Sequence, residues 1–248
     1  FRAHPVKNVY AGPIFWEIKH AKQVMRAYRD FLPRAPVALG PFIGLKTVPS
    51  TTPFPEDREH ASYDRAAVER FWHVLEWTDE VLEEFAGWYC GKTSPVHLFW
   101  HGLDLALTRF GGARAPALPE AGPVDQETYS HEVVSCGFWA GDENVREPSF
   151  YSYTAPEPAD LRQQRLHPAE AFWSEQGGGS LALLPYDAVR RASDPRAALL
   201  AFLESAYRAG AGLSGWDQAA LDSSWCPSPP ELSNILAGLE PTPRAAEE

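Results

Sequence analysis

The sequence predicts an α+β protein in which helices cover one face of an antiparallel sheet. Two segments, 64–85 and 195–209, have helical periodicity and one strongly apolar side each. Strand-like segments occur between them, at 96–110, 131–139, 149–154 and 181–186. A chain of 248 residues with 44% hydrophobic content has the composition of a globular protein. The apolar sides of the two helices therefore predict one helical layer packed on one sheet face.

Both helices have local signals for where they begin. Asp64 and Asp194 precede the periodic segments, and an aspartate side chain can accept hydrogen bonds from the first free backbone N–H groups. Pro195 then suits the first helical position, where a missing N–H costs nothing. Gly87 or Gly91 is expected to end the first helix.

The strand predictions rest on alternation and on turn residues. In 103–110 leucines alternate with Asp104, Ala106 and Thr108, so 96–110 is interpreted as one strand. The segments 131–139 and 149–154 are expected to pair antiparallel across a turn-like connection. Residues 111–126 are interpreted as a surface loop, and Pro168 as the start of a short helix over AEAFW.

The chain divides into three parts. Residues 1–52 are predicted to form a small strand–helix–strand appendage, and three prolines in 49–57 mark a boundary. Residues 53–225 are expected to form the main domain. Residues 226–248 are polar and rich in Pro, Ala and Glu, which predicts a largely disordered tail.

Charge and cysteine content exclude several classes of function. The formal net charge is −11, and no cluster of Lys and Arg indicates binding to nucleic acid or an anionic membrane. No run of about 18 apolar residues predicts a membrane span. Cys90, Cys136 and Cys226 fit neither a zinc motif nor a redox pair, so we expect reduced thiols and a cytoplasmic protein.

Two consecutive parts of the sequence resemble two different protein families. Positions 4–54, with HPVKNVYAGPIFW, AYRDFLPRAP and GLKTVPSTTPF, resemble a fragment of bacterial FAD-linked oxidases of the berberine-bridge type. In that family the cofactor-holding parts lie upstream of this stretch and further catalytic residues lie downstream. Neither part is present here, and about fifty residues cannot both shield a flavin and anchor its pyrophosphate. No cofactor is therefore expected.

Positions 53–217 resemble a largely actinobacterial domain family of unknown function, DUF family five-nine-nine-six. The motifs that carry this likeness are PFPEDREHASYDRAAVERFW, GKTSPVHLFWHGLDLALTRFGGARAP, YSHEVVSCGFWAGD, FYSYTAPEP, LLPYDAVR and FLESAYRAGAGLSGWD. They occur in the family's order. The resemblance implies no activity, and it makes the chain look like a fusion with a seam near residue 53.

Five polar residues in apolar segments are the candidate catalytic residues. His97, Asp104 and Arg109 lie in or beside one predicted strand, and His131 and Glu132 begin another. A histidine that titrates near neutral pH is a natural general base, which a carboxylate can orient. Arg109 could clamp an anionic group. Together they predict a pocket for a small polar ligand.

The strand parity limits which of these side chains can meet. If 97–109 is continuously extended, His97, His101 and Arg109 share one face and Asp104 lies on the other, unless a bulge at Gly102 breaks the parity. SHEVV lacks the second histidine of HExxH, and GKTS lacks the first glycine of a phosphate loop. No metal site is therefore expected.

Three interpretations stay open. In the first, the candidate residues form a binding or catalytic pocket; the competing interpretation of each residue is a hydrogen bond within the core. In the second case the protein is a noncatalytic module that buries an aromatic surface against a partner or a second copy of itself. A remnant of an FAD-linked oxidoreductase is the third interpretation.

Overall fold

The computed structural model describes residues 64–99, 103–117, 120, 122–141, 145–176 and 179–223. The predicted appendage at 1–52, the break at 49–57, the tail at 226–248, His101 and Cys226 lie outside these residues. Of the two family-like segments, only the second is therefore seen in three dimensions.

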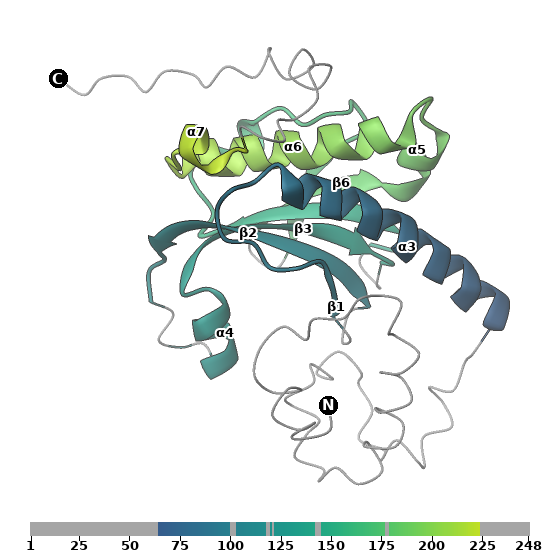
Figure 1. Ribbon diagram of the computed structural model, residues 1–248, viewed down its shortest axis with the longest axis horizontal. Coiled ribbons are helices and arrows are strands. Elements are labelled where there is room, and N and C mark those ends of the chain that lie inside the picture. Colours follow the sequence, from purple (N-terminus) through teal and green to yellow (C-terminus); the bar gives the residue numbers. More distant parts are fainter. Residues whose placement is uncertain are drawn as a thin grey trace, which may run out of the picture.

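The described residues form one six-stranded antiparallel sheet (Figure 1). An antiparallel sheet was predicted, but from four segments, because 96–110 was predicted to be one strand and β5 was not predicted. Its strands are β1 (His97–Phe99), β2 (Asp104–Arg114), β3 (His131–Trp139), β4 (Ser149–Ala155), β5 (Phe172–Gln176) and β6 (Gly179–Pro185). They lie in the order β1-β2-β3-β4-β6-β5. The hairpin of β5 and β6 thus returns so that β6 occupies the place beside β4.

Two long helices cover the same face of this sheet, α3 (Arg65–Gly87) and α6 (Pro195–Leu213) (Figure 1). Both predicted caps are confirmed: Asp64 accepts a hydrogen bond from the Ala67 N–H at 2.9 Å, and Asp194 accepts one from Ala197 at 3.0 Å. The shorter helices are α4 (Pro123–Thr128), η5 (Leu161–Gln163), α5 (Tyr186–Arg191) and α7 (Gln218–Leu221). The predicted α+β class with helices on one face is confirmed.

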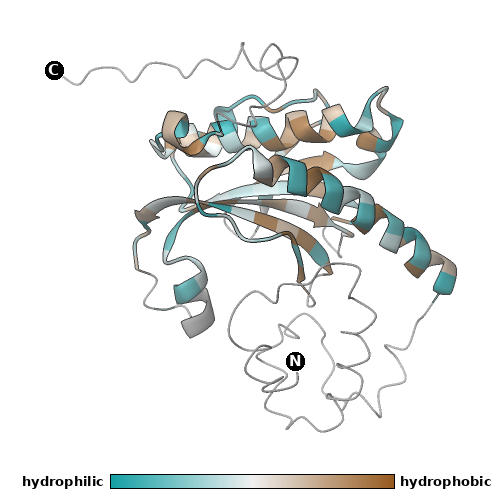
Figure 2. Ribbon diagram, in the orientation of Figure 1, coloured by the Kyte–Doolittle hydropathy of each residue, from teal (hydrophilic) through white to brown (hydrophobic). Residues whose placement is uncertain are grey.

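The core lies between the helices and this covered face of the sheet. Apolar stripes on α6 and along the strands meet there (Figure 2). The side chains buried in this layer include Leu82, Phe85, Leu105, Leu107, Phe138, Phe150, Leu184, Leu199, Phe202 and Tyr207. A smaller apolar cluster, Ala106, Tyr151 and Leu183, lies on the opposite face.

Three local predictions were wrong. Segment 96–110 is two antiparallel strands, β1 and β2, which reverse before Leu103, whose φ is +51°. AEAFW is not helical: Phe172 and Trp173 begin β5, because Trp173 pairs with Ala182 and its indole N–H donates to the Gln164 carbonyl. Segment 111–126 is also more than a loop, since β2 continues to Arg114 and α4 follows.

Asp79 on α3 gives a pH-dependent contribution to stability. Partial burial, with smaller repulsion from Glu83 and Glu80, raises its pKa from 3.8 to about 6. The folded protein therefore binds this proton more tightly than the unfolded chain, and the folded state loses stability as pH rises from 3.8 through about 6. Asp79→Asn should stabilise the protein by up to about 1 kcal/mol near pH 7, because half-exposure screens the effect.

The measurement is urea unfolding of Asp79→Asn near pH 7 and near pH 3, with Glu170→Gln, an exposed carboxylate that does not act on Asp79, as control. The gain should largely disappear at the lower pH, which is below 3.8, because the wild-type carboxyl is then mostly protonated in both the folded and the unfolded state. An equal gain at both pH values would show that the raised pKa is not its cause.

Among the described residues, no helix is long and apolar enough to cross a membrane.

Candidate functional site

The reversal between β1 and β2 decides which candidate residues meet. His97 lies opposite Ala106 in the antiparallel register, so both side chains share one face with Asp104 and Thr108. Arg109 lies on the other face, toward the helices. The pairing of His97 with Arg109 on one face, expected for a continuous strand, is therefore wrong, since the chain turns between them.

Asp104 and Tyr151 form the centre of the site on the opposite face. The Tyr151 hydroxyl donates a 2.8 Å hydrogen bond to the Asp104 carboxylate, across the intervening strand β3. The small residues Ala106 and Gly137 lie between them in the register, which leaves room for the Tyr151 ring. Burial, followed by the charge and hydrogen bond of Asp104, raises the pKa of Tyr151 well above 10.0, so its hydroxyl stays protonated.

His97 lies beside this pair with one ring nitrogen in use. Its Nδ1 is 2.8 Å from the Pro95 carbonyl, which can only accept, so Nδ1 carries the proton and Nε2 is an acceptor. The residue is 2% exposed, and its Nε2 has no hydrogen-bond partner among the residues that the structure describes. Burial lowers the pKa of His97 below 6.5, against smaller opposing effects of Pro95 and Asp104. His97 is therefore a neutral imidazole whose buried Nε2 lone pair is free to accept a hydrogen bond.

Hydroxyl groups continue along the same face. Thr108 Oγ1 and Ser135 Oγ are 3.0 Å apart, and the hydroxyls of Tyr129 and Tyr153 are 3.4 Å apart. The rings of Tyr151 and Tyr153 stack with an interplanar angle of 10°. Burial raises the pKa of Tyr153, so it too stays a neutral phenol. Aromatic rings and neutral hydroxyls thus lie beside His97 and Asp104 on this face.

His131 lies at the far end of β3. It is opposite Arg114 in the register, and its Nδ1 is 3.1 Å from the Ser130 hydroxyl. Six strand positions separate it from Gly137, which amounts to about 20 Å at a rise of about 3.3 Å per residue. The structure therefore does not bring His131 to His97 and Asp104.

Arg109 points into the covered face and is 2% exposed. Its Nη2 donates to the Phe85 carbonyl at 2.5 Å, in the last turn of α3, and its guanidinium carbon lies 3.5 Å from the centre of the Phe85 ring. The rings of Tyr207 and Tyr89 lie 4.4 and 5.0 Å away. Burial lowers the pKa of Arg109, against the opposing charge of Glu204. Arg109 is therefore a buried cation that lies against three aromatic rings.

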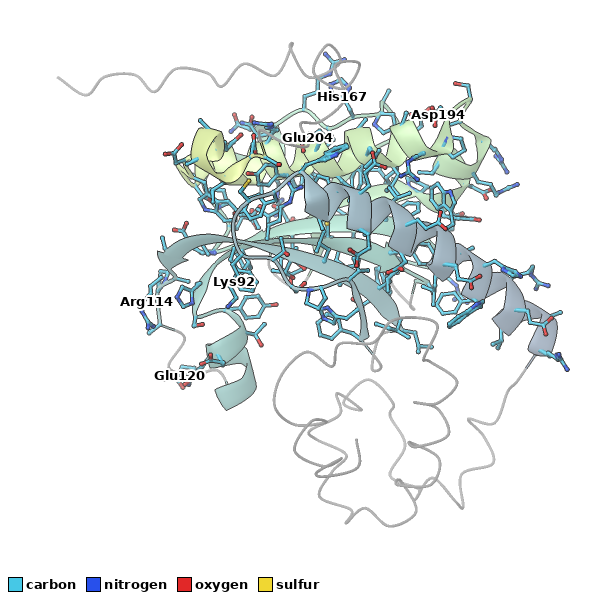
Figure 3. All side chains as sticks on the ribbon, viewed as in Figure 1. Lys92, Arg114, Glu120, His167, Asp194 and Glu204 are labelled. Atoms are coloured by element: carbon cyan, nitrogen blue, oxygen red, sulfur yellow. The ribbon has the colours of Figure 1, made fainter. Side chains whose placement is uncertain are left out.

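The carboxylate nearest Arg109 comes from α6. Glu204, labelled in Figure 3, has an oxygen 4.0 Å from Arg109 Nη1 and also accepts from Arg208 at 2.8 Å. Arg208 continues to Asp222 at 2.7 Å. The buried charge is thus balanced by a chain of ion pairs that leads to the surface.

Glu132 has a structural partner too. Its carboxylate accepts a 2.8 Å hydrogen bond from the Trp216 indole, which ties the start of β3 to the residues after α6. Of the five candidates, only His97 and Asp104 lie together, while Arg109 and Glu132 occupy the other face.

The described thiols and the described side chains that could bind a metal form no second candidate site. Burial raises the pKa of Cys136 to about 12, which makes its thiol unreactive, and Cys90 is exposed. In the part of the chain that the structure describes, no three His, Cys, Asp or Glu side chains are grouped so that they could hold a metal ion.

Comparison with models of known protein families shows which family this chain belongs to. The model of DUF5996, described as a family of unknown function, matches residues 22–223. The chain belongs to the DUF5996 family. No curated protein matches it, and no solved structure does. The match to DUF5996 begins upstream of the boundary predicted at residue 53, and that boundary stays a prediction.

Sequence reasoning missed Tyr151 and Gly137 as parts of the DUF5996 site. Tyr151 was missed because its link to Asp104 spans 47 positions and depends on the sheet register. One signal was present: Gly137 interrupts an otherwise apolar strand, and a glycine there often marks a close approach of another group.

Proposed function

We propose that the face of the sheet opposite α3 and α6 binds a small polar molecule through His97, Asp104 and Tyr151. The single observation that carries the proposal is the unpartnered Nε2 of His97. A buried polar atom without a partner costs free energy, and a site that binds a ligand is one reason to retain it.

The tautomer of His97 defines what such a ligand must offer. Because Nδ1–H is held by Pro95, Nε2 can only accept a proton or a hydrogen bond. The ligand must therefore present an O–H or N–H group. In a catalysed reaction the same nitrogen would act as general base, with Asp104 stabilising the imidazolium that forms.

Tyr151 orients the Asp104 carboxylate. Tyr151 holds Asp104 by its hydroxyl, so the carboxylate has a defined position before any ligand arrives. Arg109 and Glu132 are assigned no part in binding, since both lie on the covered face, where Arg109 donates to the Phe85 carbonyl and Glu132 accepts from the Trp216 indole. Without a cation in this role, a neutral donor fits the site better than an anion.

The test is ligand-observed NMR with a library of small alcohols, amides, amines and carboxylates. Donor compounds should bind the wild type and lose binding in His97→Phe, which keeps a ring and removes Nε2. Binding should also weaken as pH falls below 6.5 toward the lowered pKa of His97, because the protonated ring cannot accept.

The matched control is His131→Phe, a histidine on the same strand face but at the end of β3. It should bind as the wild type does. A library in which no compound distinguishes the wild type from His97→Phe contradicts the proposal.

A second candidate function is an interaction module. Large apolar side chains are exposed at both edges of the sheet: Phe172 is 49% exposed on β5, and Leu103 is 45% exposed before β2. A short edge strand with an exposed aromatic residue suits pairing with a second copy of the chain.

Sedimentation equilibrium tests this candidate. If β5 mediates self-association, the wild type is a dimer and Phe172→Glu shifts it to monomer, because a charge cannot be buried without a partner. Leu103→Glu is the control at the opposite edge. If the wild type stays monomeric at high protein concentration, self-association through β5 is excluded.

Flavin chemistry is not proposed. The family match already includes residues 22–54, most of the segment that resembles FAD-linked oxidases, and no comparison supports that resemblance.

A further inference from the structure

A groove on the helical layer lies well apart from His97 and Asp104. It is lined by Arg70, His73, Val74 and Trp77 of α3 and by Tyr186, the first residue of α5, and its volume is about 300 Å³. The four α3 residues follow the spacing of one helix face. A volume of this size is at the lower end of small-molecule sites, which suits a ligand with one ring.

The aromatic walls of the groove are held by the core. The Trp77 ring packs edge-on against Phe150, with 6.4 Å between centroids, and the Tyr186 ring lies 5.9 Å from Phe138. Phe138 and Phe150 are 2% and 0% exposed. Since these contacts already restrict both wall residues, a ligand pays little entropy to order them.

Arg70 gives the groove its charge. Neighbouring arginines on the helical layer are all paired with carboxylates: Arg65 with Glu69, Arg190 and Arg191 with Asp187, and Arg196 with Glu84. Arg70 makes no ion pair or hydrogen bond with any residue that the structure describes. His73 is engaged with Glu76 at 3.2 Å. Among the described residues, Arg70 is therefore a groove-lining cation without a carboxylate partner.

We propose that this groove binds a small aromatic carboxylate. The ring lies against Trp77 and Tyr186, and the carboxylate takes two hydrogen bonds from the planar fork of Arg70. The site is independent of the proposed His97 site, which lies on the other side of the sheet.

The experiment uses benzoate, with benzyl alcohol and benzylamine as neutral and cationic analogues. Binding to the full chain is followed by the chemical shift of the Trp77 indole N–H, assigned with Trp77→Phe. Benzoate should bind with a Kd of about 1 mM and about fivefold more tightly than benzyl alcohol, the preference that an exposed ion pair provides. Benzylamine should bind least, and added salt should reduce the preference.

Arg70→Gln should remove the preference for benzoate over benzyl alcohol while both still shift the Trp77 signal. Arg65→Gln, an exposed arginine one turn earlier on α3, should leave the preference unchanged. Both substitutions are at the surface, so both variants should fold. Equal binding of the three compounds by the wild type, a preference that survives Arg70→Gln, or no shift of the Trp77 signal would each overturn the proposal.

Discussion

Replacing Arg109 with methionine should destabilise the protein by about 3–5 kcal/mol. The substitution leaves the Phe85 carbonyl without its donor and Glu204 without one of its two cations, both in the core. It also removes a cation from between three aromatic rings. Urea unfolding measured by circular dichroism gives the change in the free energy of unfolding.

The matched variants separate charge from packing. Arg109→Lys keeps the charge but lacks the planar fork, and should still lose about 2 kcal/mol. Combining Arg109→Met with Glu204→Gln should recover part of the loss, because no buried carboxylate is then left short of a cation. A loss below about 1 kcal/mol in Arg109→Met would mean that the buried charge adds no net stability.

Gly137→Ala should lower the free energy of unfolding nearly as much as Arg109→Met does. A Cβ at this position would lie 2.0 Å from the Leu105 carbonyl oxygen and 3.0 Å from the Ala106 Cα. These are backbone atoms of the neighbouring strand, so β2 and β3 must separate to make room. We expect a loss of at least about 3 kcal/mol in thermal or urea unfolding.

Gly87→Ala is the control for the glycine substitution. Nothing lies within 4 Å of a Cβ built at Gly87, the last residue of α3. Its stability should change by less than about 1 kcal/mol. Equal effects of the two substitutions would contradict the close approach of β2 to Gly137.

Local features of the fold could be predicted, because their causes are local. The aspartates before α3 and α6 bind backbone N–H groups three residues later, and the apolar faces follow helical spacing. The strands at 131–139 and 149–154 were predicted to within a residue. By contrast, β5 is a strand because β6 returns beside it, and AEAFW alone gives no sign of that.

The candidate site could be predicted only in part. His97 and Asp104 were identified by type, since histidine and aspartate are unusual in an apolar strand. Which residues they would lie beside could not be predicted. A continuous strand would place His97 on the same face as Arg109 and Asp104 on the opposite face. Because the chain reverses between β1 and β2, His97 instead shares a face with Asp104. Tyr151 enters the site only through the register of β3 and β4.

The placement of β6 between β4 and β5 has a consequence during synthesis of the chain. Until residues 179–185 leave the ribosome, the backbone of β4 has an unpaired edge, and until 195–213 follow, its apolar side lacks α6. Bare edges of this kind pair with other chains. Premature termination before residue 179 should therefore yield a product that aggregates. A chain that lacks only the residues after 223 keeps both β6, which pairs with the edge of β4, and α6, which covers its apolar side.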